Sequence, residues 1–100
     1  MRLASIGILR SLSRDSDPDV RDWATFALAE SDRTDEHTRE ALLARTGDED
    51  DDTRAEAIYG LARRRDPRAR EFVERALASG PVGALILRAR DELASGDPDA

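Results

Sequence analysis

The sequence predicts an all-α fold, a short right-handed α-solenoid of about three helix pairs with six helices. Three observations lead to this prediction. A segment with a distinctive pattern of Asp, Arg, Ala and Leu recurs after 33 residues, a period typical of helical repeats. Residues that start and end helices divide the chain into helix-length segments. No segment alternates apolar and polar residues with the period of two that a half-buried strand requires.

The internal repeat appears when residues 17–28 are compared with residues 50–61. Asp17, Asp19, Arg21, Ala24 and Leu28 recur at matched positions as Asp50, Asp52, Arg54, Ala57 and Leu61. An aromatic side chain also recurs, since Phe26 matches Tyr59. Because one unit of this size cannot bury its own apolar face, we expect the two copies to stack side by side.

Helix start and stop signals place the individual elements. The six expected helices form three pairs, 3–13 with 18–30, 35–46 with 51–64, and 67–78 with 81–95. Asp17-Pro18 and Asp66-Pro67 each offer an N-cap acceptor followed by proline at the first helical position, and Thr34 or Asp35 can cap the 35–46 helix. Gly47 and Gly80 stand where a left-handed residue often ends a helix, and Pro81 is expected to start the last helix.

The apolar spacing within these helices predicts the buried faces. The expected stripes are Val20, Ala24, Ala27 and Leu28; Thr53, Ala57, Gly60 and Leu61; Phe72, Val73, Ala76 and Leu77; and Val82, Leu85, Ile86, Ala89 and Leu93. Their small residues predict close approach of the helices. We expect one domain over 1–96, with repeats near 1–32, 33–65 and 66–96 and a frayed tail over 97–100.

The composition excludes several classes of protein. The chain of 100 residues has no cysteine, which excludes disulfides, thiolate metal sites and a cysteine nucleophile. Its 22 acidic residues against 16 basic ones, all of them arginine, give a net charge of -6, which argues against nucleic acid as a partner. No apolar run approaches the roughly 20 residues that span a membrane, and the N-terminus lacks the pattern of a signal peptide. We therefore expect a cytoplasmic protein without a membrane partner.

No catalytic residue, metal site or cofactor is expected. His37 is the only histidine, and one histidine without cysteine cannot form a common metal site. The acidic run 48–52 lacks the spacing, central glycine and distal glutamate of an EF-hand loop, so we interpret it as a helix-capping turn. No pair of carboxylates shows a reason for a raised pKa, and no nucleophile–base arrangement is evident. The sequence therefore does not predict an enzyme.

Arg21 and Arg54 occupy the first turns of their helices, where a cation is unfavourable by about 0.3–1 kcal/mol because it opposes the helix dipole. We expect a compensating carboxylate, either four residues earlier in the same repeat or in the turn of the neighbouring repeat. The predicted result is a structural ladder of Asp17, Arg21, Asp50 and Arg54. The surrounding carboxylates argue against binding of a separate anion.

The first helix is unusually apolar for the end of a solenoid. Its apolar residues are Leu3, Ile6, Ile8, Leu9 and Leu12, and few charges cover its outer side. Because terminal repeats usually present a polar outer face, this pattern suggests a homo-oligomer formed through the first helix, or docking on another chain. A longer parent protein would give the same pattern.

The segments 15–21 and 48–54, each followed by Ala three residues on and Leu seven residues on, resemble HEAT repeats. The resemblance is greatest to the short variety named after phycobilisome lyases, and it covers two clear repeats and a weaker third. It implies a protein-interaction scaffold whose helices near 18–30, 51–64 and 81–95 line a concave face. It also implies two alternatives, a bilin-lyase-like enzyme that modifies a small molecule and a relative of the HEAT-like DNA glycosylases.

Trp23, Phe26, Tyr59 and Arg63 are the candidate partner-binding residues on that face. At 100° per residue, Trp23 and Phe26 lie about 60° and 120° from the apolar stripe of their helix. Trp and Tyr are enriched among binding hot spots, although these rings could instead pack between adjacent second helices. We therefore predict a non-catalytic module that binds a protein partner, whose identity the sequence does not reveal.

Overall fold

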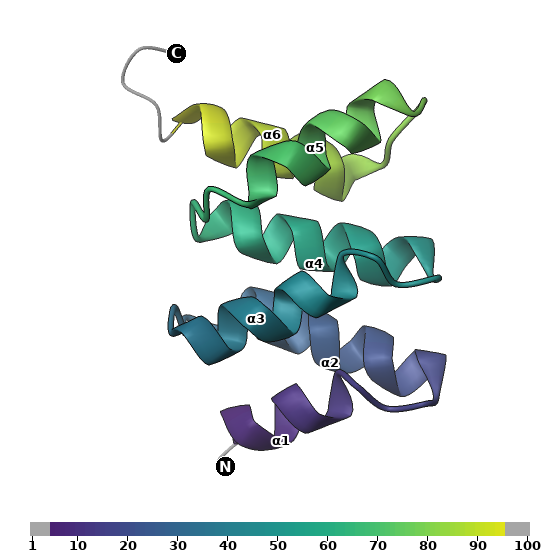
Figure 1. The fold of residues 1–100 in the computed structure, drawn as a ribbon, viewed down its shortest axis with the longest axis vertical. Coiled ribbons are helices and arrows are strands. Elements are labelled where there is room, and N and C mark those ends of the chain that lie inside the picture. Colours follow the sequence, from purple (N-terminus) through teal and green to yellow (C-terminus); the bar gives the residue numbers. More distant parts are fainter. Residues whose placement is uncertain (1–4, 96–100) are drawn as a thin grey trace.

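The computed structural model describes residues 5–95, which form six α-helices and, within that range, no strand (Figure 1). The helices are α1 (Ile6–Leu12), α2 (Pro18–Glu30), α3 (Glu36–Arg45), α4 (Asp51–Arg63), α5 (Ala69–Ala78) and α6 (Ala84–Ser95). The all-α prediction is confirmed, and every predicted segment contains one helix. Leu3 and the predicted tail over 97–100 lie outside the described residues.

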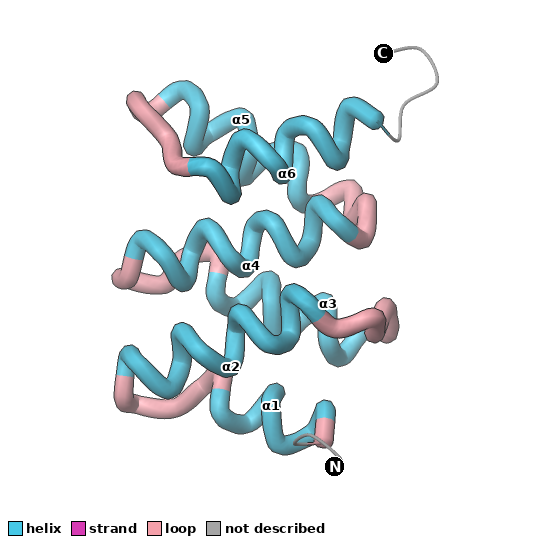
Figure 2. Tube along the Cα trace, turned by 180° about the vertical axis from the view of Figure 1, so that it is seen from behind, coloured by secondary structure: helices cyan, strands magenta, loops and turns pink. Residues whose placement is uncertain are grey.

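The helices form two layers. α2, α4 and α6 lie side by side in one layer, and α1, α3 and α5 pack across one side of it (Figure 1, Figure 2). Successive pairs stack along the longest dimension of the molecule, 40 Å. The two copies of the repeated segment lie in α2 and α4, which contact each other along their length. The predicted solenoid of stacked helix pairs is therefore confirmed.

Three aspartates begin helices by accepting backbone hydrogen bonds. Asp17 accepts from Asp19 at 2.9 Å, Asp35 from Thr38 at 3.1 Å and Asp50 from Thr53 at 2.9 Å. Pro18 occupies the first position of α2, as predicted. These carboxylates satisfy N–H groups that have no partner inside the helix, which explains why α2, α3 and α4 begin where they do.

The last two helices begin two and three residues later than predicted. Asp66 is not the N-cap residue of α5, which begins at Ala69; its buried carboxylate accepts from the backbone N–H of Arg68 at 3.0 Å and from the side chains of Arg68 and Arg39. The Arg68 guanidinium holds the pKa of Asp66 well below its ordinary value. Pro81 lies outside α6, which begins at Ala84. In both turns the proline precedes the helix without joining it.

The ends of the helices also differ from the prediction at one glycine. Among residues 5–95, only Arg65 and Gly80 have positive φ, at 52° and 136°. The prediction for Gly47 is therefore wrong, and the Thr46 hydroxyl instead donates to a carbonyl oxygen in the last turn of α3. After α4, Arg65 takes the left-handed position, so that the backbone N–H groups of residues 65 and 66 reach carbonyl oxygens of the helix.

The core lies between the two layers. Leu28, Leu42 and Leu61, one from each of three adjacent helices, are fully buried at its centre. Gly60 allows α4 to approach α2 closely, because a Cβ atom there would lie 2.9 Å from the Cβ of Ala29. The predicted stripes hold in α4, whereas Val20 and Ala27 of α2 are only partly buried and Leu77 of α5 is exposed. Thr25 and Ala29 complete the buried side of α2.

Candidate functional site

Two aromatic side chains stand out on the surface of α2. Trp23 is 54% exposed and Phe26 is 49% exposed. Both lie on the side of the helix away from the buried Leu28, with which neither shares a helical stripe. About half of each ring is therefore open to solvent on the layer of α2, α4 and α6, and the role of these rings in partner binding stays a prediction.

Tyr59 of α4 stands at the repeat position that matches Phe26, but its environment differs. Its side chain is partly buried and packs against the hydrophobic core. Packing within the solenoid therefore explains part of Tyr59, and only its remaining exposed part is available to a partner. Phe26 and Tyr59 thus occupy the same position in successive repeats, but the side chain of Phe26 is more exposed than that of Tyr59.

Arg63 has a structural role at the C-terminal end of the neighbouring helix α2. Its guanidinium donates to the carbonyl oxygens of Ala29 and Ser31, each at 2.9 Å, and lies 3.5 Å from the carboxylate of Asp32. Cations near the C-terminal end of a helix satisfy its free carbonyl groups. Arg63 therefore joins α4 to the end of α2, and its part in partner binding stays a prediction.

Glu56 is a functional candidate that the sequence analysis missed. Burial raises its pKa to about 8, and the neighbouring carboxylates of Asp22 and Asp52 act in the same direction. Its Oε2 atom is buried without a hydrogen-bond donor among residues 5–95, whereas Asp22 accepts a hydrogen bond from Thr53 at 3.1 Å. The protonated form is therefore favoured, because it can share its proton with Asp22. The repeat register offered a signal, since Glu56 matches Trp23 next to Asp22.

These residues together define a surface that we call the α2/α4 face: Asp22, Trp23, Phe26, Asp52 and Glu56. Trp23 and Phe26 are exposed on α2, and the carboxylates of Asp22 and Asp52 lie close enough to influence the ionisation of Glu56. Exposed aromatic side chains can bury apolar area, and carboxylates can attract positive charge.

The predicted Asp–Arg ladder has different partners from those expected. Asp17 and Asp50 cap helices and do not pair with Arg21 and Arg54, so this part of the prediction is wrong. Arg21 instead pairs with Asp48 in the turn of the next repeat, with Nε at 2.8 Å and Nη2 at 3.2 Å from the two carboxylate oxygens. This pair lowers the pKa of Asp48. The expected alternative of a neighbouring-turn partner is confirmed for Arg21.

Arg54 repeats only half of this arrangement. Its Nη1 donates to the carbonyl oxygens of Asp48 and Glu49, as Nη1 of Arg21 donates to those of Asp15 and Ser16. Its carboxylate partner is Asp51 of the same helix. The ladder therefore contains one Asp–Arg pair between repeats, that of Arg21 with Asp48. Asp48 stands at the repeat position that matches Asp15.

In the part of the chain that the structure describes, metal-binding clusters and membrane-spanning helices are both absent. Residues 5–95 contain no group of three or more His, Asp or Glu side chains arranged to hold a metal ion. His37 is exposed in the first turn of α3. None of the described helices combines the length and the apolar character needed to cross a membrane.

Comparison with known proteins identifies the repeat unit. The family model for HEAT repeats matches residues 7–94, which include all but the ends of the described solenoid. The chain belongs to the HEAT-repeat family. The match is to HEAT repeats in general, so the phycobilisome-lyase variety stays a prediction. Within the family, the Arg21–Asp48 pair joins two successive HEAT repeats.

Two curated relatives of this chain share a common name. Protein YibA of Escherichia coli strain K12 and protein YibA of Escherichia coli O157:H7 are each 32% identical to this chain over 90 residues. The match covers 90% of this chain and 32% of each relative, so the chain spans about a third of their length. No solved structure matches the chain.

Proposed function

We propose that this HEAT-repeat chain is a non-catalytic interaction module that binds a protein partner through the α2/α4 face. HEAT repeats commonly serve as protein-interaction modules, and this face carries the largest exposed aromatic side chains of the described chain. The exposure of Trp23 is the observation on which the proposal rests. A tryptophan left 54% exposed at the surface of a small repeat protein contributes little to its core and much to an interface.

The chemistry of the face specifies the partner further. Asp22 and Asp52 place negative charge on this face, whereas Glu56 is favoured in its neutral form, and the chain as a whole carries a net charge of -6. A Lys or Arg side chain of the partner would compensate this charge and can stack on Trp23. We therefore propose that the contacting segment of the partner combines basic and apolar residues.

A quantitative capture experiment tests this function. The immobilised chain, its W23A/F26A variant and its L77A variant are incubated with the same extract, and bound proteins are quantified by mass spectrometry. Leu77 is also exposed but lies on α5, in the opposite layer. Loss of a hot-spot side chain costs about 2 kcal/mol or more, so W23A/F26A should retain at most a tenth of a specific partner.

Two outcomes separate the α2/α4 face from unspecific adsorption. We expect L77A to retain the partner at the wild-type level, and raising the salt concentration to weaken capture because charges contribute to it. Equal retention by W23A/F26A and the wild-type chain would refute the proposed face. The bilin-lyase-like alternative is tested with the same proteins, since a shift in the visible absorbance of an added bilin would favour it.

A further inference from the structure

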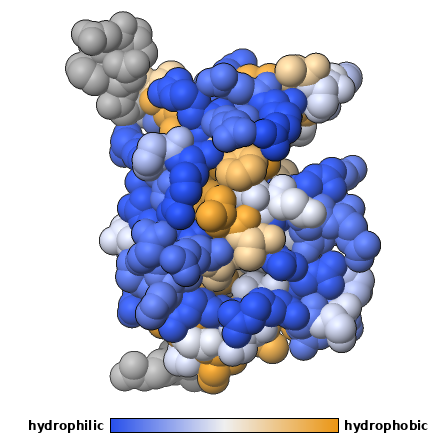
Figure 3. All heavy atoms as spheres, in the orientation of Figure 1, coloured by the Kyte–Doolittle hydropathy of each residue, from blue (hydrophilic) through white to orange (hydrophobic). Residues whose placement is uncertain are grey.

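A groove of about 600 Å³ lies between the second and third helix pairs, and Asp52 belongs both to its lining and to the α2/α4 face. It opens on the side of the molecule that α1, α3 and α5 cover, where apolar atoms form a hollow surrounded by polar ones (Figure 3). The groove exists because the outer helices separate at this junction. α1 contacts α3, whereas within residues 5–95 α3 makes no close backbone contact with α5.

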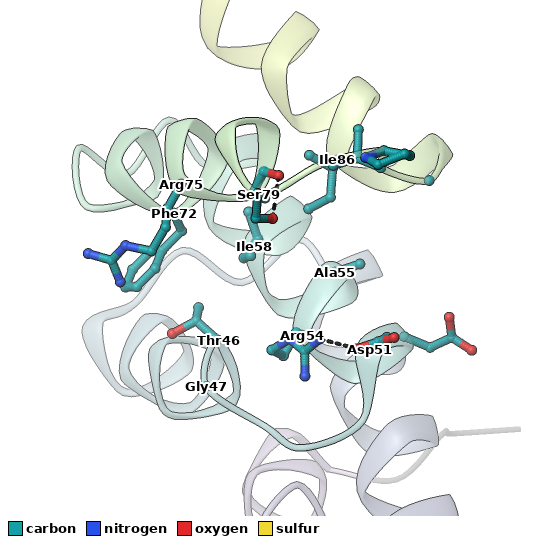
Figure 4. Close-up of a pocket in the computed structure, with 15 residues that line it drawn as sticks. Thr46, Gly47, Asp51, Arg54, Ala55, Ile58, Phe72, Arg75, Ser79 and Ile86 are labelled. Atoms are coloured by element: carbon teal, nitrogen blue, oxygen red, sulfur yellow. Dashed lines mark hydrogen bonds and ion pairs between the residues drawn. The ribbon is translucent and has the colours of Figure 1, made fainter.

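Apolar and charged side chains both line the groove, and we call the apolar ones its floor and the charged ones its rim (Figure 4). Ile58 of α4, Phe72 of α5 and Ile86 of α6 supply apolar side chains from three helices. Arg54 and Arg75 belong to the rim together with the carboxylates of Asp51 and Asp52. Such a surface can accept one bulky apolar side chain next to a charged group.

The solenoid has two junctions, one between the first and second helix pairs and one between the second and third. They differ in the carboxylate that pairs with the arginine of the preceding repeat. At the first junction, the Nε–Nη2 edge of Arg21 binds the carboxylate of Asp48, which the next turn provides. At the second junction, the corresponding turn over residues 79–83 is Ser-Gly-Pro-Val-Gly and provides no carboxylate. The repeat that would complete the ladder therefore lacks its acidic group.

The Nε–Nη2 edge of the Arg54 guanidinium, which lines the groove, is consequently only partly occupied by hydrogen-bond acceptors. Its Nη1 is held by backbone carbonyl oxygens, and its Nη2 pairs with Asp51, whose side chain is 88% exposed. Its Nε has no acceptor among residues 5–95. In Arg21, Nε and Nη2 both donate to the carboxylate of Asp48, and this two-pronged geometry is favoured for arginine–carboxylate pairs.

Arg75 adds a second guanidinium at the rim. It lies 6.0 Å from the centre of the Phe72 ring, and its charge partner Glu71 is an exposed residue of the same helix. Two arginines therefore flank the apolar floor, and their own carboxylate partners are both at the surface. In the sequence, the surrounding carboxylates argue against a separate anion at Arg54, but Asp51 and Glu71 are exposed, and a carboxylate from another molecule could displace them at low energetic cost because exposed ion pairs are weak.

We propose that the groove binds a peptide segment of a partner in which an Asp or Glu adjoins a bulky apolar residue. The ligand carboxylate takes the Nε–Nη2 edge of Arg54, as Asp48 takes that of Arg21. The adjoining apolar side chain lies on Ile58, Phe72 and Ile86. This site shares Asp52 with the α2/α4 face, but its ligand has the opposite charge and contacts the residues of the third helix pair as well.

A pair of blocked peptides tests the proposal on the full chain. The probe is acetyl-Gly-Asp-Leu-Phe-Gly-amide, and its control replaces Asp with Asn, which removes only the charge. Titration is followed by the backbone amide NMR signals. We expect saturable shifts at Ile58, Phe72 and Ile86 with the Asp peptide and at least tenfold weaker binding of the Asn peptide, because a charge-assisted pair is lost.

Variants of the chain locate the site. R54Q should weaken the Asp peptide about tenfold and bring it to the level of the Asn peptide, whereas R90Q, which removes an exposed arginine of α6, should change nothing. G83F should block both peptides without unfolding the chain, since Gly83 lines the groove and a Cβ there would meet no atom within 4 Å. Melting curves of each variant confirm that it is folded.

Three results would overturn the proposal. These are equal affinities of the wild-type chain for the Asp and Asn peptides, shifts confined to the α2/α4 face, and no binding at millimolar peptide. The first comparison needs no variant, so it decides the question even if R54Q fails to fold.

Discussion

Arg21 in α2 forms a two-pronged ion pair with Asp48, which lies 27 residues later in the turn before α4. Both side chains are nearly buried, with 9% of Arg21 and 7% of Asp48 exposed. The pair therefore fixes the position of the second HEAT repeat on the first from inside the structure. Arg45 donates to the same carboxylate at 3.0 Å and ties the end of α3 to this contact.

Replacement of Asp48 should be strongly destabilising. D48N leaves Arg21 and Arg45 without their shared carboxylate, and removal of one partner from a buried ion pair costs about 3–5 kcal/mol. We expect the free energy of unfolding, measured by urea denaturation, to fall by about 2–4 kcal/mol. The control D51N removes a carboxylate whose ion pair is exposed and should cost less than about 1 kcal/mol. Equal effects of the two variants would contradict a structural role for the Arg21–Asp48 pair.

Gly60 should not tolerate even one added methyl group. In G60A the new Cβ would lie 2.9 Å from Ala29 and 3.0 Å from Leu42, so α4 must move away from α2. We expect a loss of about 1–3 kcal/mol despite the better helix propensity of alanine. G47A is the matched control, because its Cβ would meet no atom within 4 Å and should leave stability nearly unchanged. Thermal denaturation of both variants checks this difference, and a G60A variant as stable as the wild type would show that the close approach is not required.

Glu56 should make stability depend on pH in the neutral range. Its pKa rises from 4.5 in the unfolded chain to about 8 in the folded one, so the folded state binds more protons between these values. Stability should therefore fall as pH rises from about 4.5 to 8, the reverse of the usual behaviour of a carboxylate. E56Q should flatten this dependence and stabilise the chain at pH 8.5 by about 1 kcal/mol, a value reduced because Glu56 is partly exposed. Parallel pH slopes for the two proteins in urea denaturation would exclude this role.

The repeat pattern was sufficient to predict the fold, because identical residues at matched positions require the same local structure. Asp17 and Asp50 reveal their capping roles through position alone, next to a helix start. The partner of Arg21 was harder to predict, since either of two nearby turns could supply it. Only the stacking of repeats selects Asp48. The same limitation applies to Glu56, whose pKa depends on Asp22 across the interface between α2 and α4.

The aromatic residues of the α2/α4 face should contribute little to stability. Trp23 and Phe26 are each about half exposed, so W23A/F26A should change the free energy of unfolding by less than about 1 kcal/mol and leave the helical circular dichroism intact. Loss of partner binding by this variant then reports on the interface and not on folding. An unfolded W23A/F26A variant would instead show that these rings belong to the core.

The fluorescence of Trp23 tests the proposed interface most directly, because it is the only tryptophan in the chain. Quenching by acrylamide is measured for the free chain and for its complex with a captured partner that has no tryptophan or has its tryptophans replaced. We expect strong quenching of the free chain and at least a threefold smaller quenching constant in the complex. Equal quenching in the two states would show that the partner leaves Trp23 uncovered and would contradict binding through the α2/α4 face.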